Sequence, residues 1–99
     1  MYNMFVEITF DPKKNARNIQ ERNLSFELAA EFDFESAATH VEQRGSENRI
    51  VSVGYLGDRL HVLCYLETDT GIRVISFRKA NAREAMKYGI PKALSHINE

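Results

Sequence analysis

Residues 50–77 read IVSVGYLGDRLHVLCYLETDTGIRVISF, and this stretch decides the fold. Its apolar residues recur at every second position, and two glycine-containing segments interrupt them, Gly57-Asp58 and residues 68–71. Alternation between short turns predicts three consecutive strands, and loops this short join only antiparallel neighbours. Residues 36–43 predict a weaker fourth strand. We therefore expect a mostly antiparallel sheet.

The register of the first predicted hairpin decides which side chains share a face. If Gly57-Asp58 is a two-residue turn, Leu56 pairs with Arg59 and the flanking residues alternate between the faces. One face then carries an aliphatic set that we expect to be the core: Val51, Val53, Tyr55, Leu60, Val62, Cys64 and Leu66. The other face is mixed polar and aromatic, and we interpret it as a candidate binding surface: Ser52, Gly54, Arg59, His61, Leu63 and Tyr65.

Helices are predicted before and after the sheet segment in the chain. Residues 3–10 predict a first strand that precedes them. A short tail helix is expected at 92–97. Three further helices begin at capping residues: Asp11 for 12–22, Ser25 for the next segment, and Asn81, with Glu84 three positions later, for the segment that ends at Gly89 and Pro91. In the first helix, Ala16 and Ile19 form a thin apolar stripe.

The predicted fold class is α+β. Two N-terminal helices and a C-terminal helix pack on a mostly antiparallel sheet of four to five strands, in one domain spanning residues 1–99. We expect the N-terminal helices to cover the face of Val51, Val53 and Val62.

Length and composition fit one small globular domain. The chain has 99 residues, of which 43% are hydrophobic and 27% charged, a balance that excludes a disordered chain. No apolar run approaches the ~20 residues of a membrane span, and the first ten residues lack a signal-peptide pattern, so we expect a cytoplasmic protein. The single Cys64 is expected to be a small core residue, and neither a metal site nor a cofactor is predicted.

Charge is segmented along the chain. Residues 11–22 hold four basic and two acidic side chains, residues 23–48 one basic and six acidic, and residues 78–92 five basic and one acidic. The two basic segments either converge on a polyanion or form separate solvated faces, and charge alone leaves both readings open.

The last predicted hairpin carries side chains suited to phosphate. Arg73, Arg78 and Lys79 lie on its second strand and Tyr65 on its first, and arginine forks bind phosphate in a bidentate manner. In a straight strand, Arg73 and Arg78 are five residues apart and face opposite sides. Both can serve one site only if the chain bends near Phe77 or the site wraps the sheet edge.

Five segments in this order resemble the BrnT toxins, ribonuclease toxins of the RelE-like superfamily: ITFDPKKNARN at 8–18, LSFELAAEFDF at 24–34, ENR at 47–49, GDRLHVLCYLE at 57–67 and RVISFRKANAREAMKY at 73–88. The resemblance implies a compact RelE-like α+β toxin that cleaves RNA and halts translation. It also implies neutralisation by a ribbon-helix-helix antitoxin, BrnA, through which any contact with DNA would be made.

The resemblance also implies six site residues: Arg22, Glu47, Arg49, Tyr65, Arg73 and Arg78. Two positions depart from the family. Many relatives have histidine where Arg22 stands, and alanine is common where Phe77 stands. RNA cleavage without a metal needs a general base, and because arginine is a poor base the candidates are these: Glu47, His61, Lys79 and Tyr65.

Three functions remain open from the sequence: an active ribonuclease toxin, a catalytically degenerate toxin homologue that binds its antitoxin, and an RNA- or protein-binding module without a toxin role. A purely structural reading also stands for the site. In that reading Arg49 and Arg73 pair with surface carboxylates, and Glu84 is only a helix cap.

Overall fold

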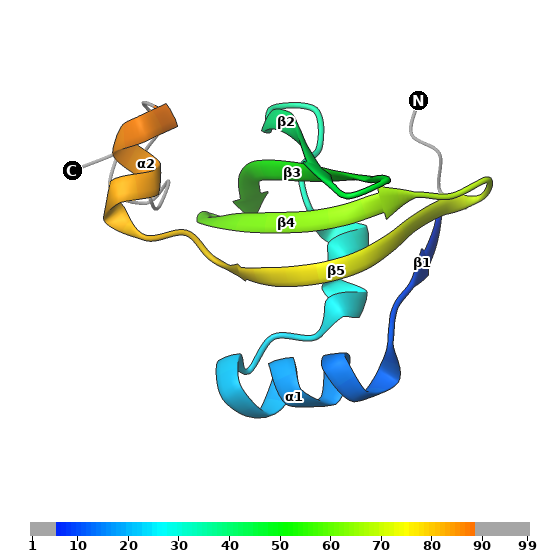
Figure 1. Ribbon diagram of the computed structural model, residues 1–99. Helices are drawn as coiled ribbons and strands as arrows, with labels where there is room; N and C mark the ends of the chain where they lie inside the picture. The colour runs from blue at the N-terminus through cyan, green and yellow to red at the C-terminus, as the bar shows by residue number, and fades with distance from the viewer. Residues whose placement is uncertain (1–5, 89–99) are drawn as a thin grey trace.

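The computed structural model describes residues 6–88, which form a five-stranded sheet with helices on both of its faces (Figure 1). The strand order is β1-β5-β4-β3-β2. The elements are β1 (Glu7–Thr9), α1 (Pro12–Arg22), η1 (Phe26–Glu31), β2 (Ala38–Arg44), β3 (Glu47–Leu56), β4 (Arg59–Glu67), β5 (Gly71–Lys79) and α2 (Ala82–Tyr88). This order confirms the predicted succession of strands and helices. The predicted tail helix at 92–97 lies outside the described residues.

Short polar residues begin and end the helices as predicted. The Asp11 side chain accepts a hydrogen bond from the Lys13 amide, and Asn23 ends α1 in the left-handed conformation with φ of 55°. Ser25 caps η1 by accepting from the Glu27 amide. The capped segment at 26–31 is a 3₁₀ helix, six residues long.

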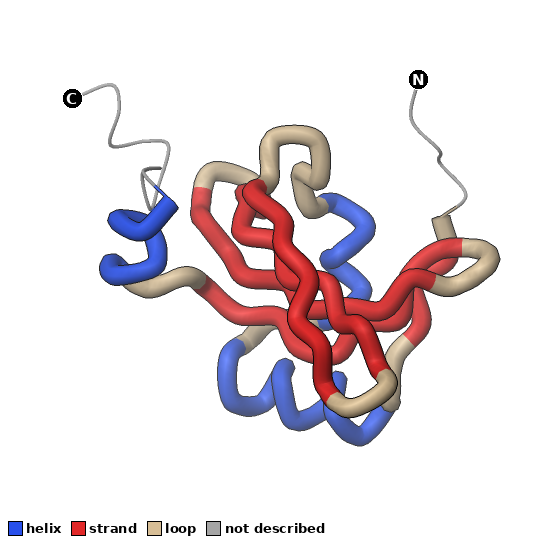
Figure 2. The backbone as a smooth tube through the Cα atoms, turned by 45° about the horizontal axis from the view of Figure 1, so that its top comes forward, coloured by secondary structure: helices blue, strands red, loops and turns tan. Residues whose placement is uncertain are grey.

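The sheet confirms the predicted hairpins. Gly57 adopts φ of +64° in the two-residue turn between β3 and β4, so Leu56 pairs with Arg59. The central strands are antiparallel, and the exception is β1, which pairs in parallel with the start of β5, from Gly71 to Arg73. The predicted fourth strand is β2, at the other edge of the sheet (Figure 2).

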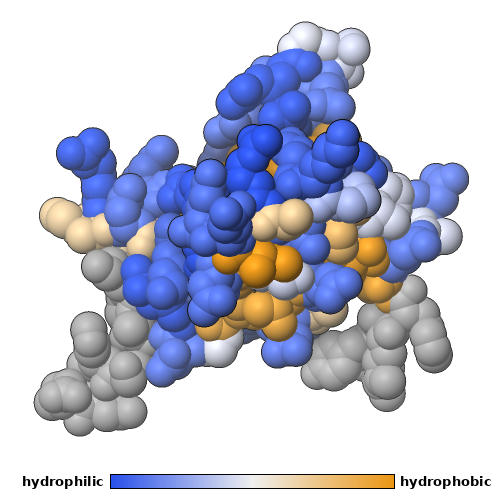
Figure 3. All heavy atoms as spheres, turned by 90° about the horizontal axis from the view of Figure 1, so that it is seen from below, coloured by the Kyte–Doolittle hydropathy of each residue, from blue (hydrophilic) through white to orange (hydrophobic). Residues whose placement is uncertain are grey.

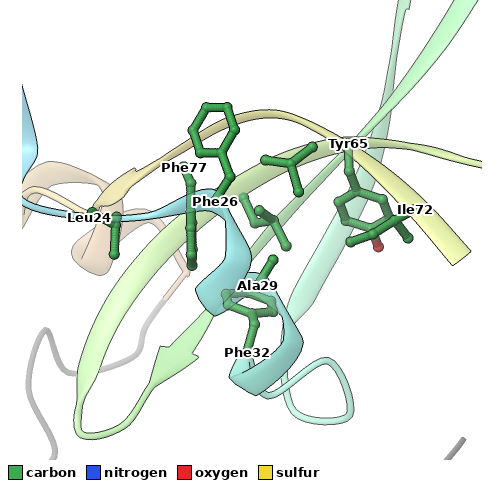
Figure 4. Close-up of a cluster of buried hydrophobic side chains, with 9 residues drawn as sticks. Leu24, Phe26, Ala29, Phe32, Tyr65, Ile72 and Phe77 are labelled. Carbon is green, nitrogen blue, oxygen red and sulfur yellow. The ribbon is translucent and has the colours of Figure 1, made fainter. Parts of the chain in front are cut away.

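The prediction of which face the N-terminal helices cover is wrong. The 3₁₀ helix η1 and the residues that flank it cover the face of Ser52, Leu63 and Tyr65, which was interpreted as a binding surface and is instead the larger core (Figure 4). That core consists of Leu24, Phe26, Ala29, Phe32, Leu63, Tyr65, Ile72, Val74 and Phe77. Gly54 makes room for it, because a Cβ at that position would lie 2.9 Å from the Phe32 ring. An aromatic-rich face of the sheet and η1 with its flanking residues thus bury one another.

The aliphatic face predicted as the core is buried by other residues. Val51, Val53, Leu60 and Val62 cluster with Ala80 and with Ala85 of α2. Both faces of the central strands are therefore covered, which the alternation of residue types alone did not reveal. Within the described residues, no helix is long and apolar enough to cross a membrane.

Candidate functional site

A β-bulge in β5 brings the two predicted arginines of that strand to one face. Cys64 pairs with Ser76 and Tyr65 pairs with Val74, so Ile75 is an extra residue without a partner on β4. Arg73 is opposite Leu66 and Arg78 is opposite Val62. Because Leu66 and Val62 are four residues apart on β4, the two arginines lie on the same face, about 13 Å apart along the strand. The two arginines thus share a face because of the bulge at Ile75 and not because of a bend near Phe77.

Arg49 lies on the same face as Arg73. Tyr65 pairs with Ile50, so Leu66 is opposite Arg49 on one side and Arg73 on the other. The two arginines are two strands apart, about 10 Å between Cα atoms. The Arg49 Nε donates to Glu47 Oε1 at 2.9 Å, so this arginine has the carboxylate partner that the structural reading expected, whereas Arg73 is exposed.

Burial raises the pKa of the neighbouring Cys64 thiol, although the charge of Arg49 opposes that shift. Cys64 therefore stays a neutral thiol at neutral pH, in keeping with its prediction as a core residue and not a nucleophile.

The second half of β5 is an open edge of the sheet, and basic side chains gather there. Since β1 pairs only with Gly71 to Arg73, the part of the chain that the structure describes places no strand beyond residues 74–79, and α1 lies beside this edge (Figure 1). A cavity of about 260 Å³ opens there, lined by Arg22, Leu24, Arg78 and Lys79. The two basic segments of the sequence thus converge, because 11–22 contributes one wall and 78–79 the other.

Asn18 positions Arg22 at this cavity, and the sequence analysis missed it. It is the buried residue of α1, whereas Ile19 of the predicted apolar stripe is 44% exposed. The Asn18 Nδ2 donates to the backbone carbonyls of Leu24 at 2.9 Å and Phe77 at 3.0 Å, and its Oδ1 accepts from Arg22 Nη1 at 3.0 Å. One carboxamide therefore ties α1 to β5 next to Arg78 while it holds Arg22.

Arg78 is held by the first turn of α2. Its guanidinium donates to both carboxylate oxygens of Glu84, at 2.9 and 2.6 Å. These hydrogen bonds hold the pKa of Glu84 at about 2 and raise that of Arg78. The Asn81 amide also donates to Glu84 Oε1 and the Glu84 amide donates to Asn81 Oδ1, which confirms the predicted capping box. Glu84 is thus both a helix cap and the counter-ion of Arg78.

Tyr65 and His61 lie on the face of the larger core, opposite to the face of Arg49, Arg73 and Arg78. The Tyr65 hydroxyl is 3.3 Å from the Ser52 hydroxyl inside the core, and the Tyr65 side chain is 8% exposed. His61 is 4% exposed and packs on Phe77, and burial lowers its pKa. Both side chains are therefore enclosed in the core and not exposed at the open edge of β5.

Two further side chains have partners away from the cavity. His40 lies 3.3 Å from Glu42 and 3.4 Å from the Tyr88 hydroxyl of α2. Phe77 is fully buried and packs edge-on against Phe32, so its ring fills the core and does not enter the cavity. Among the described residues, no group of three or more His, Cys, Asp or Glu side chains is arranged to hold a metal ion.

Comparison with known proteins accounts for this architecture. Residues 10–84 match the family described as the ribonuclease toxin, BrnT, of type II toxin-antitoxin systems. The chain belongs to the BrnT family. No curated protein sequence matches it. Among solved structures it is similar to the 1.1 Å crystal structure of the Brucella abortus ribonuclease toxin BrnT, with a TM-score of 0.61 and 22% sequence identity over 77% of this chain and 97% of that one.

Membership in the BrnT family extends from Phe10, before α1, to Glu84, the counter-ion of Arg78. The whole open edge of β5 and both of its basic walls are therefore part of the matched region. The likeness to the Brucella BrnT shows that the two chains share a fold. The roles of individual side chains here follow from the geometry of this chain.

Proposed function

We propose that this BrnT-family chain is an endoribonuclease toxin that cleaves RNA without a metal ion, at the open edge of β5, and thereby inhibits translation. One observation carries the proposal: Arg22 and the pair Arg78 and Lys79, far apart in the sequence, line one cavity. A cavity with three cationic side chains suits a phosphodiester, because guanidinium forks bind phosphate oxygens and stabilise the charge that develops on them.

The arginines differ in how much charge they offer to a phosphate. Within residues 6–88, no carboxylate forms an ion pair with Arg22 or Arg73, and the partner of Arg22 is the neutral Asn18 amide. Arg78 shares its charge with Glu84. We therefore assign stabilisation of the phosphorane to Arg22, with Arg78 orienting the phosphate and Arg73 binding the RNA further along the same strand.

The general base is the second part of the mechanism. Of the four candidates, Lys79 lines the same cavity as Arg22 and Arg78, whereas Glu47 lies across β4 and is bound to Arg49. Proximity alone favours Lys79 as the group that takes the proton of the 2'-hydroxyl, a role that requires its neutral amine form and leaves the positive charge at the phosphate to Arg22 and Arg78. A pH–rate profile of Lys79→Ala beside Glu47→Gln separates the two, because the variant that removes the base abolishes the rise of the cleavage rate with increasing pH.

The proposed partner is a ribbon-helix-helix antitoxin of the BrnA type, with DNA bound only through that antitoxin. Membership in a toxin-antitoxin family supports an antitoxin partner. The exposed acidic side chains from η1 into the loop that follows suit a basic protein surface: Glu27, Glu31, Asp33 and Glu35.

Arg22→Ala tests the ribonuclease assignment, and Arg44→Ala is its control. Arg44 is 64% exposed at the β2–β3 hairpin and lines neither basic cavity described here. Loss of one contact to a transition-state oxyanion lowers kcat by ~100-fold to ~1000-fold, so Arg22→Ala should lose RNA cleavage and growth arrest while Arg44→Ala keeps both. A folded Arg22→Ala protein that cleaves RNA at the wild-type rate would overturn the assignment.

A catalytically degenerate toxin is the second candidate. The observation in its favour is that two of the predicted catalytic arginines, Arg49 and Arg78, are held by the protein's own carboxylates, Glu47 and Glu84. In that case the wild-type chain binds its antitoxin tightly and leaves cellular RNA intact when expressed alone, whereas an active toxin arrests growth.

A further inference from the structure

A second cavity lies against the same edge of the sheet and takes no part in the mechanism above. It has a volume of about 240 Å³ and lies between α1 and the bulge of β5. Its basic lining consists of Lys14, Arg17 and Arg22. Arg22 also lines the first cavity, so the two cavities adjoin at this side chain.

The charge of the second cavity favours an anion. Three cationic side chains line it against one carboxylate, that of Glu21. Lys14 and Arg17 are three residues apart on α1, which places them on one side of the helix, and both are exposed. Within the described residues neither has an ion-pair partner, so their charges are available to a ligand.

The cavity also has an apolar wall. Phe26 of the core and Ile75, the extra residue of the bulge, line it beside the cations. Figure 3, which views the molecule from the α1 side, shows the same combination: hydrophilic side chains over most of the surface and a smaller group of hydrophobic ones among them. A ligand that combines a phosphate with a flat or apolar ring fits such a lining, and a nucleotide is one.

The length of the basic row matches more than one phosphate. Lys14 and Arg22 are eight residues apart on α1, about 12 Å along its axis. Successive phosphates of one nucleic-acid strand are closer together than that, so an RNA strand with one phosphate at Arg22 brings a neighbouring phosphate to Arg17 and Lys14.

We propose that the cavity between α1 and the β5 bulge is a binding subsite for the nucleotide adjoining the cleaved bond, with Lys14 and Arg17 binding its phosphate. This inference rests on the proposed ribonuclease function, because it places the cleaved phosphodiester in the neighbouring cavity. Lys14 and Arg17 are binding residues here, and they contribute to affinity for longer RNA and not to the chemical step.

The test compares the double variant Lys14→Ala/Arg17→Ala with Lys13→Ala. Lys13 is an exposed cation on the same helix that does not line the cavity, which makes it a matched control for the general field of α1. Binding is measured by fluorescence anisotropy on a single-stranded RNA hexamer with 2'-deoxy positions that block cleavage. Cleavage kinetics are measured in parallel on an unmodified hexamer and on a dinucleotide, whose single phosphate occupies the first cavity and leaves Lys14 and Arg17 without a phosphate to bind.

For the double variant we expect roughly 10-fold weaker hexamer binding, a KM for the hexamer raised by a similar factor, and kcat within about 2-fold of wild type. The slope of log K against log salt should fall by about 0.7, since Lys14 and Arg17 together neutralise one phosphate and each neutralised phosphate of a single strand contributes about 0.7. Dinucleotide cleavage should not change, and thermal melting should show that the fold is intact.

Two outcomes would overturn the subsite. In one, the double variant matches Lys13→Ala in affinity and salt slope; in the other, dinucleotide cleavage falls as much as hexamer cleavage. Failure of the proposed function looks different, because the wild-type chain then cleaves neither substrate. The anisotropy comparison still decides the subsite in that case.

Discussion

Replacing Asn18 by alanine removes a single carboxamide group, and we expect it to lower the free energy of unfolding substantially. The side chain of Asn18 satisfies the carbonyls of Leu24 and Phe77, and both hydrogen bonds are buried. A buried carbonyl without a partner costs about 1 to 3 kcal/mol, so the two together cost about 2 to 6 kcal/mol. Alanine is the better helix former by about 0.6 kcal/mol, which leaves a net loss of roughly 1.5 to 5 kcal/mol.

For a domain of this size, such a loss lowers the melting temperature by at least about 6 °C. The measurement is thermal unfolding followed by circular dichroism, with urea unfolding as a second readout. Gln20→Ala is the control, because Gln20 is an exposed amide on the same helix. If Asn18→Ala melts within about 2 °C of Gln20→Ala, the carboxamide does not join α1 to β5 and the account of how Arg22 is positioned fails.

Three further predictions test other parts of the molecule. Val62→Asp should unfold the domain, because Val62 is 6% exposed among aliphatic side chains and an unpaired buried carboxylate costs several kcal/mol; an unchanged circular dichroism melt would contradict that core. Glu84→Gln should be less stable than wild type above pH 4.5, and this difference in stability should vanish as the pH falls toward 2. The reason is that the folded-state pKa of Glu84, about 2, is below the ordinary 4.5, and protonation removes the ion pair with Arg78. Urea unfolding midpoints measured across this pH range test the prediction, and a difference that stayed constant would contradict a stabilising ion pair. Changing the exposed acidic residues Glu31, Asp33 and Glu35 to lysine should slow association with the antitoxin at low salt, measured by stopped flow. An unchanged association rate would remove this surface from the interface.

The candidate site was only partly accessible from the sequence. Resemblance to a family selected Arg22, Arg73 and Arg78, and the structure brings Arg22 and Arg78 to one cavity. Tyr65 was selected with them, yet its ring is in the core on the other face of the sheet. Asn18 was passed over because an amide among charged residues on a helix resembles any solvated side chain. What distinguishes Asn18 is its place on the side of α1 that faces β5, where its amide reaches the Phe77 carbonyl.

Local chemistry by itself determined the elements of this protein. Alternation between the turns at Gly57 and residues 68–71 determined the hairpins, and Asp11, Ser25 and Asn81 determined where helices begin. These signals act between residues close in the chain, through turn conformation and capping hydrogen bonds, so they can be read without the fold.

The tertiary structure decided which face each helix covers and which side chains meet. A period of two sorts side chains onto two faces but cannot say which face a distant helix will bury, and here both are buried. The bulge at Ile75 is equally invisible in the sequence, because it exists only as a mismatch between β4 and β5. That one extra residue turns Arg73 to the face of Arg78, since a single inserted position reverses the alternation of every side chain beyond it.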